Sequence, residues 1–219
     1  MKKYELTEDS ITFIGRKLFR IRAIRSFNDV AAGDLGGYVE KEENLSHDND
    51  AWISDNARIF GDARICDNAW ISGYAHIYDH ADIYGNARIY GNACISGNAR
   101  ICGNACICGN ACIFGDARIS GNACIFGNTC SYDNISISDN AHISDDADYL
   151  YLKGLGSENR NTTFFKCKDG HIHVSCGCFS GNLAEFETKV KKTHGDSKYA
   201  KEYLACIEVV KIHFKEENK

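Results

Sequence analysis

A hexad of apolar and polar positions runs through the middle of the chain, from Ala51 to about Tyr149. Isoleucine recurs at almost every sixth residue, alanine stands two residues before it, and Gly-Asn or Gly-Asp begins two residues after it, as in IYGNAR at 83–88. A period of six fits neither an α-helix nor a simple hairpin. It predicts a parallel β-helix in which each hexad forms one short strand and one corner, with Ile and Ala both pointing inward.

The corner residues and the one break in the series agree with this interpretation. Glycine adopts a positive φ at no steric cost and asparagine tolerates it, so Gly-Asn suits a corner. The isoleucine series breaks at Ser131, and four residues later an alanine position holds Ile135. A small residue replaces a large one and a large residue replaces a small one, which predicts that volume is conserved within one packed corner.

The segments on either side of the repeat predict caps. Residues 1–42 contain the alternating stretches YELT, SITFIG and KLFRIRAIR, which favour strands, and DLGGYV (34–39) is interpreted as a turn into the first coil. We therefore expect an N-terminal β cap at 1–42 and the repeat domain at 43–149, because a solenoid needs its open ends covered.

Residues 150–219 do not follow the hexad and predict a small α+β module. It should contain a strand or two, a hairpin turned by Asp169-Gly170, and helices at about 183–194 and 197–215. The predicted fold class is therefore mainly β, with a β-helix between an N-terminal β cap and a C-terminal α+β module.

The hexads resemble those of the hexapeptide-repeat proteins, which form a left-handed parallel β-helix with three hexads per coil. That family usually has glycine directly after the aliphatic residue, whereas here Gly comes one residue later. AGDLGGYVEKEENLSH (32–47), the IYGNAR run and VSCGCFSGNLAEF (174–186) also resemble a narrower group of hexapeptide-repeat proteins, often encoded by phages and prophages. The resemblance implies a homo-oligomer, with a trimer favoured.

Three hexads per coil would stack equivalent residues of every third hexad, so the outward residues sort into three faces. The residue before each isoleucine position is 58, 76, 94, 112 and 130 on face one, 64, 82, 100, 118 and 136 on face two, and 52, 70, 88, 106, 124 and 142 on face three. Face two is polar and is expected to be solvated, whereas faces one and three are too apolar to be exposed to water over several coils. We expect self-association or docking of the C-terminal module there, with a ligand groove as the alternative. The candidate interface or ligand residues are Arg58, Phe60, His76, Tyr78, Phe114 and Tyr132 on face one, and Trp52, Trp70, Arg88 and Tyr90 on face three.

The cysteines are dense along the sequence but are distributed over the three faces. Cys106, Cys108 and Cys124 would share face three on neighbouring coils, and three thiols can bind a soft metal. A structural zinc site normally has four ligands, and no CxxC pair occurs, so we expect no metal. In CKDGHIHVSCGC (167–178), alternation is interpreted as placing Cys167 with the other cysteines in the core, and His171 and His173 on the exposed side.

Charge and composition narrow the function classes. The net charge of −5 argues against a nucleic-acid partner, and no apolar run reaches the length of a membrane span. The first residues lack the apolar core of a signal peptide, so we expect a cytoplasmic protein in a bacterial host cell with reduced cysteines.

The predicted function is a non-catalytic oligomeric scaffold or binding protein that binds a host protein or sequesters a small metabolite or nucleotide signal in counter-defence, as a phage or prophage product would. The alternative is an acyl-CoA-dependent acyltransferase, with His80 or His76 as the general base. A structural virion or assembly component is the second alternative. No recognised catalytic motif occurs and no cofactor is expected, which favours a protein without enzymatic activity.

Overall fold

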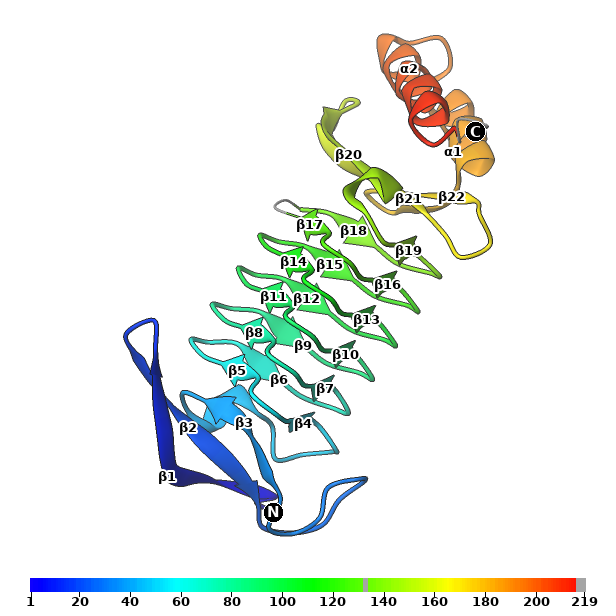
Figure 1. Ribbon diagram of the computed structural model, residues 1–219. Coiled ribbons are helices and arrows are strands. Elements are labelled where there is room, and N and C mark those ends of the chain that lie inside the picture. The colour runs from blue at the N-terminus through cyan, green and yellow to red at the C-terminus, as the bar shows by residue number, and fades with distance from the viewer. Residues whose placement is uncertain (132–133, 216–219) are drawn as a thin grey trace.

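The computed structural model describes residues 1–131 and 134–215, and it confirms a mainly β protein built around a β-solenoid of about six turns (Figure 1). Each solenoid strand has two residues, one outward and one inward. The strands of face one are β5 (Arg58–Ile59), β8 (His76–Ile77), β11 (Cys94–Ile95), β14 (Cys112–Ile113) and β17 (Cys130–Ser131). Face two has β6 (Arg64–Ile65), β9 (Asp82–Ile83), β12 (Arg100–Ile101), β15 (Arg118–Ile119) and β18 (Ser136–Ile137). Face three has β4 (Trp52–Ile53), β7 (Trp70–Ile71), β10 (Arg88–Ile89), β13 (Cys106–Ile107), β16 (Cys124–Ile125) and β19 (His142–Ile143).

Strands of one face pair in parallel with a register of three hexads, as the sequence predicts. On face one, for example, Arg58 pairs with His76 and Ile59 pairs with Ile77. The inward isoleucines and alanines are at most 2% exposed, and Ser131 and Ile135 are both buried as well. The apolar core is therefore a continuous column that no single coil could bury alone.

The corners use glycine and asparagine for two different purposes. Gly103 has a φ of 68°, and a Cβ there would lie 2.8 Å from the carbonyl oxygen of Gly121 in the next coil. Asparagine follows the glycine and supplies a side-chain ladder, in which Nδ2 of Asn104 donates to Oδ1 of Asn122 at 2.9 Å. The same ladder joins Asn68, Asn86, Asn104, Asn122 and Asn140. Positive φ thus falls on the glycine position, while the asparagines connect successive coils.

The N-terminal segment extends the sheet of face one. β1 (Tyr4–Phe13) and β2 (Arg16–Ala23) form an antiparallel hairpin, and β3 (Leu35–Val39) pairs with both β2 and β5. The interpretation of 34–39 as a turn was therefore wrong, because most of it is strand. Gly36 and Gly37 serve close packing there, since a Cβ on either would lie within 2.7 Å of a backbone oxygen of the first coil.

This N-terminal segment also covers apolar residues of faces one and three. The ring of Phe13 lies 5.8 Å from that of Phe60 and 4.7 Å from that of His76, measured between centroids. Phe27 meets Trp52 edge to face at 5.5 Å. We expected oligomer contacts or the C-terminal module to cover these apolar faces, but the first coils are covered by the chain's own N-terminal segment.

A four-stranded antiparallel sheet and two helices follow the solenoid (Figure 1). The sheet strands are β20 (Tyr149–Leu155), β21 (Arg160–Lys166), β22 (Ile172–Cys176) and β23 (Phe179–Asn182), and the helices are α1 (Leu183–His194) and α2 (Lys198–His213). Two single 3-10 turns, Glu42–Asn44 and Asp146–Asp148, flank the solenoid. One face of the sheet packs Phe164 and Val174 against the helices, while Phe165 and Cys167 join the core of the solenoid. Within the described part of the chain, neither helix has the length and apolar character of a membrane span.

The hairpin between β21 and β22 corrects the expected positions of its thiol and imidazoles. Phe165 pairs with His173 and Lys166 pairs with Ile172, so odd-numbered residues of both strands share one face. Cys167 therefore lies on the same side as His171 and His173, and His173 is buried. The predicted separation of Cys167 from the two histidines was wrong because it did not carry the alternation correctly across the turn.

Asp148 connects the last coil to the C-terminal sheet. Its carboxylate lies 2.9 Å from Nζ of Lys166 and accepts hydrogen bonds from the amide and the hydroxyl of Ser144. Burial opposes the charged form, but Lys166 and Ser144 outweigh it and lower the pKa of Asp148 to about 2. A carboxyl whose pKa is depressed on folding stabilises the fold above its unfolded value, and this contribution disappears as the pH falls towards the folded value.

We predict that Asp148→Asn lowers the free energy of unfolding at pH 7 by about 2 kcal/mol, the equivalent of the depressed pKa. The variant should also lose part of the acid destabilisation that the wild type shows between about pH 4 and pH 2. Urea titrations across this range measure both effects. Glu158→Gln, an exposed carboxylate in the same module, is the control, and an equal loss in both variants would contradict the assignment.

Candidate anion-binding cleft

A cleft of about 420 Å³ lies where face two meets the C-terminal sheet. Ser136 on the last strand of face two donates its backbone N–H to the hydroxyl of Thr163 on β21 at 3.1 Å, which joins the two walls. The volume falls in the range of small-molecule sites. The lining residues are Asn98, Arg100, Asp116, Arg118, Asn134, Ile135 and Ser136 from the solenoid, and Arg160, Asn161, Thr163, Ser175 and Gly177 from the module.

Three arginines give the cleft its chemistry. Arg100 and Arg118 are direct partners on β12 and β15, and parallel neighbours lie about 4.8 Å apart. Arg160 begins β21 on the opposite wall, where its guanidinium lies against Gly177. Guanidinium groups bind phosphate and carboxylate oxygens with paired hydrogen bonds, so two walls that both present arginine can hold an anion between them.

The cleft lining holds three arginines and one carboxylate, that of Asp116. Asp82 is the register neighbour of Arg100, but its carboxylate accepts from Nε of Arg64 at 2.9 Å. Asp116 lines the cleft and accepts a hydrogen bond from Asn98 at 2.8 Å. Across residues 1–131 and 134–215, no ion pair forms to Arg100, Arg118 or Arg160. The cleft therefore favours an anionic ligand.

A second groove continues from the cleft along the corner between faces one and two, with Asn98 and Arg100 lining both. It contains His80, whose Nδ1 lies 3.6 Å from the carboxylate of Asp62. Lys41 donates to Asp62 at 2.6 Å, and this contact lowers the pKa of Asp62. The sequence interpretation singled out His80 but missed its carboxylate. The signal was available, because Asp62 holds the equivalent corner position exactly one coil before His80.

The predicted residues of face one lie beneath or near the N-terminal hairpin. Nε2 of His76 is 3.1 Å from a guanidinium nitrogen of Arg58, and burial together with that charge lowers the pKa of His76. Phe60 and Tyr78 stack with their centroids 4.9 Å apart. Phe114 lies further along the same face, and Tyr132 falls outside the described residues. His76 is thus half-buried among cap residues, whereas His80 is exposed.

The predicted residues of face three begin with one column of register neighbours. Trp52 is buried, and the register continues from it through Trp70 to Arg88. Tyr90 is 42% exposed, and its hydroxyl accepts from the thiol of Cys106 at 3.4 Å.

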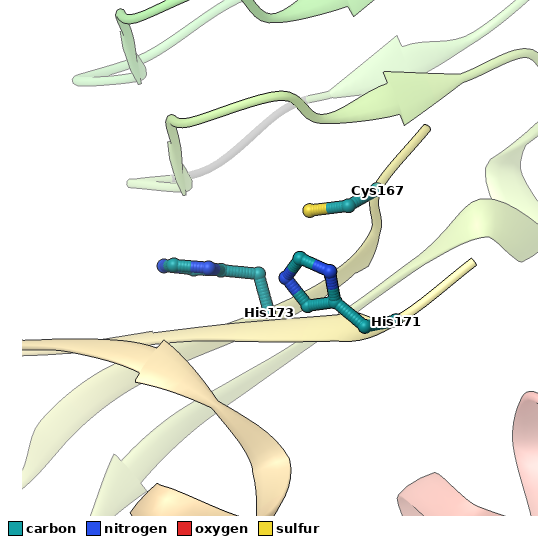
Figure 2. Close-up of side chains that lie close together, drawn as sticks. All are labelled: Cys167, His171 and His173. Atoms are coloured by element: carbon teal, nitrogen blue, oxygen red, sulfur yellow. The ribbon is translucent and has the colours of Figure 1, made fainter. Parts of the chain in front are cut away.

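The three face-three cysteines, Cys106, Cys108 and Cys124, where no metal was expected, do not bring their donor atoms within 4.8 Å of one another. Cys106 and Cys124 are register partners, and burial is the first cause of a rise in the pKa of Cys124 to about 11. Across the described residues, three potential metal-ligating groups come within 4.8 Å of one another at Cys167, His171 and His173 instead, and not at Cys106, Cys108 and Cys124. Figure 2 shows these three side chains gathered at the end of the β21–β22 hairpin.

Comparison with known proteins supports the solenoid fold, and the matches cover only part of the chain. Residues 81–97 match the model of a family described as "YdcK Beta solenoid repeat". The chain is also 41% identical over 70 residues to the "Uncharacterized acetyltransferase YdcK" of Escherichia coli (strain K12), an alignment that covers 28% of this chain and 22% of the relative. The chain thus spans about a fifth of the length of that relative. These likenesses support the resemblance to hexapeptide-repeat β-helix proteins.

We predict that Arg118→Gln leaves the free energy of unfolding within about 0.5 kcal/mol of the wild type, because an exposed side chain without a carboxylate partner contributes little to the fold. At low ionic strength the variant should be slightly more stable, since adjacent like charges on paired strands repel each other. Urea titrations at low and high salt measure the difference. A loss above about 1 kcal/mol, which is larger than surface substitutions usually cause, would contradict a ligand-directed role for this guanidinium.

Proposed function

We propose that the chain binds a small molecule that carries phosphate groups in the cleft between face two and the C-terminal sheet. The observation that carries the proposal is the set of Arg100, Arg118 and Arg160 on two facing walls without an ion-pair partner among the described residues. This proposal is a form of the expected binding protein, and the interface or ligand residues expected on faces one and three stay predictions.

The other lining groups favour a phosphate attached to a polar molecule over a simple ion. Asn134, Asn161 and Ser175 surround the arginines with neutral hydrogen-bonding side chains. Such groups pair with hydroxyls and amides of a sugar or a base, while the guanidinium groups neutralise the phosphate. A nucleotide or a similar phosphorylated metabolite satisfies both requirements.

Isothermal titration calorimetry with inorganic phosphate, pyrophosphate, AMP, ADP and coenzyme A tests this proposal at constant ionic strength. We expect binding by at least one nucleotide-type compound. Arg118→Gln and Arg160→Gln should each weaken it roughly 10- to 100-fold, the usual effect of losing a hydrogen bond to a charged group. Arg88→Gln removes an exposed arginine of face three and should leave the affinity unchanged. No binding to any compound, or an equal loss in Arg88→Gln, would rule the cleft out.

A second candidate function is acyl transfer, in which coenzyme A is the phosphate-bearing molecule. The groove that contains His80 and Asp62 is continuous with the arginine cleft through Asn98 and Arg100, so a long ligand could bind in both. His80 would remove a proton from the acceptor as general base, and Asp62 would orient its ring. The similarity to a relative named an acetyltransferase favours this candidate.

Transfer from acetyl-coenzyme A to a panel of amines and alcohols tests the second candidate. If it holds, His80→Ala should lower the turnover roughly 10²- to 10⁴-fold, as expected for the loss of a general base. His142→Ala, an exposed histidine of face three, is the matched control. Turnover that survives in His80→Ala excludes His80 as the base, and binding without turnover favours a non-catalytic ligand-binding protein.

The assembly state and the origin of the protein are proposed from the sequence and the family resemblance, and not from the cleft. We propose a homo-oligomer, with a trimer favoured, on the basis of the hexapeptide-repeat resemblance. Native mass spectrometry of the purified protein would measure the number of subunits and detect a retained ligand. The phage or prophage origin, the host partner and the cytoplasmic location remain predictions of the sequence.

A further inference from the structure

The β21–β22 hairpin brings a thiol and two imidazoles together at the end of the solenoid. Donor atoms of Cys167, His171 and His173 all lie within 4.8 Å of one another (Figure 2). Cys167 also forms a β-bridge to Ala141 in the last coil, so the cluster lies at the joint between the repeat and the C-terminal sheet. Cys167 and His173 are buried, while His171 is partly exposed and leaves a route from solvent.

Each imidazole already has one nitrogen held by a neighbour. Nδ1 of His171 contacts the carboxylate of Asp169, which leaves Nε2 available. Nε2 of His173 hydrogen-bonds the hydroxyl of Ser180 at 2.8 Å, so Nδ1, which lies next to the carboxylate of Asp139, is the nitrogen that can bind a metal. Metal-binding histidines characteristically give their second nitrogen to a carboxylate, carbonyl or similar acceptor, which fixes the tautomer and the ring orientation. Both histidines of the hairpin follow this pattern.

A carboxylate of the solenoid lies beside His173. The carboxylate of Asp139 lies 3.1 Å from Nδ1 of His173, and Asp139 belongs to the corner between β18 and β19. A carboxylate this close to the available nitrogen can accept its proton when the site is empty or share a cation with it. The three donor atoms of the hairpin converge without Asp139, so its side chain has to close toward them to complete a set of one sulfur, two nitrogens and one oxygen.

We propose that Cys167, His171, His173 and Asp139 bind one Zn²⁺ ion that clamps the C-terminal hairpin to the last coil of the solenoid. Zn²⁺ accepts thiolate, imidazole and carboxylate in a four-coordinate site, whereas Ca²⁺ and Mg²⁺ prefer oxygen ligands alone. On binding, the thiol of Cys167 releases its proton to solvent, and the single proton of the neutral His173 ring sits on Nε2, where it donates to the hydroxyl of Ser180. The lone pairs of the thiolate and of Nδ1 then form the bonds to the metal. The side chains must close around the ion, and the partly exposed ring of His171 has the freedom to do so.

Metal titration of protein stripped with a chelator tests this site. Elemental analysis should find one zinc per chain after removal of excess metal. Substitution with Co²⁺ should give a thiolate charge-transfer band in the near ultraviolet and intense visible bands typical of four-coordinate cobalt. Cys167→Ser should abolish the charge-transfer band, and Asp169→Asn should weaken zinc binding roughly 10- to 100-fold by releasing the His171 ring.

Two control variants separate this site from the other thiols. Cys124→Ser removes a thiol of the face-three cluster, and Cys178→Ser removes an exposed thiol of the same module. Both should keep the stoichiometry and the cobalt spectrum of the wild type. His171→Asn should lose the metal and still fold, because its side chain is partly exposed.

The wild type failing to retain zinc, or Cys167→Ser keeping the charge-transfer band, would overturn the proposal. A band lost in Cys124→Ser but kept in Cys167→Ser would place the metal on the solenoid instead and overturn it as well. None of these four ligands lines the arginine cleft, so the metal test uses different residues from the phosphate test, and either proposal can fail without the other.

Discussion

Stacking of each coil on the next at a fixed register of three hexads is the constraint on which the rest of this structure depends. Two-residue strands form too few hydrogen bonds to persist alone, and one coil cannot bury its own isoleucines and alanines. The register solves both problems, because each strand hydrogen-bonds two neighbours and each inward side chain packs on its equivalent. Glycine suits most corners for the same reason, since a Cβ at Gly103 would crowd the next coil, although corners such as that of Asp79 hold aspartate with a positive φ.

The same register explains how much could be predicted from the sequence. The six-residue period assigned the outward residues to their faces. It also placed two pairs of residues, on which the proposed functions depend, at equivalent positions of successive coils. Arg100 and Arg118 occupy equivalent positions of successive coils, as do Asp62 and His80, yet only the histidine was singled out as a candidate. The expectation that face two is polar and solvated agrees with the exposure of both arginines, but it did not consider that a polar face can also carry an excess of one charge.

The contacts of the caps could not be predicted in this way. Phe13 covers His76 through a hairpin whose direction depends on tertiary packing, and no periodicity relates the two residues. The C-terminal hairpin was a different case, since its turn fixes the pairing of Phe165 with His173. Partner numbers across that hairpin have the same parity, and this rule alone places Cys167 beside His171. The proximity of Cys167 to the two histidines could therefore have been predicted from the sequence, whereas the position of Asp139 beside His173 could not.

Both proposed sites lie where the repeat ends, and the repeat itself gives the reason. A column of equivalent positions tends to gather similar side chains, while a binding site needs different groups that converge. The C-terminal sheet supplies that difference: Thr163 and Ser175 line the arginine cleft, and Phe165 and His173 lie next to them on the same face of the sheet. A clamp that fixes His173 against Asp139 also fixes the strand that carries Ser175. The metal site would then act on the cleft by holding one of its walls in place, which lowers the ordering cost of binding without touching the ligand.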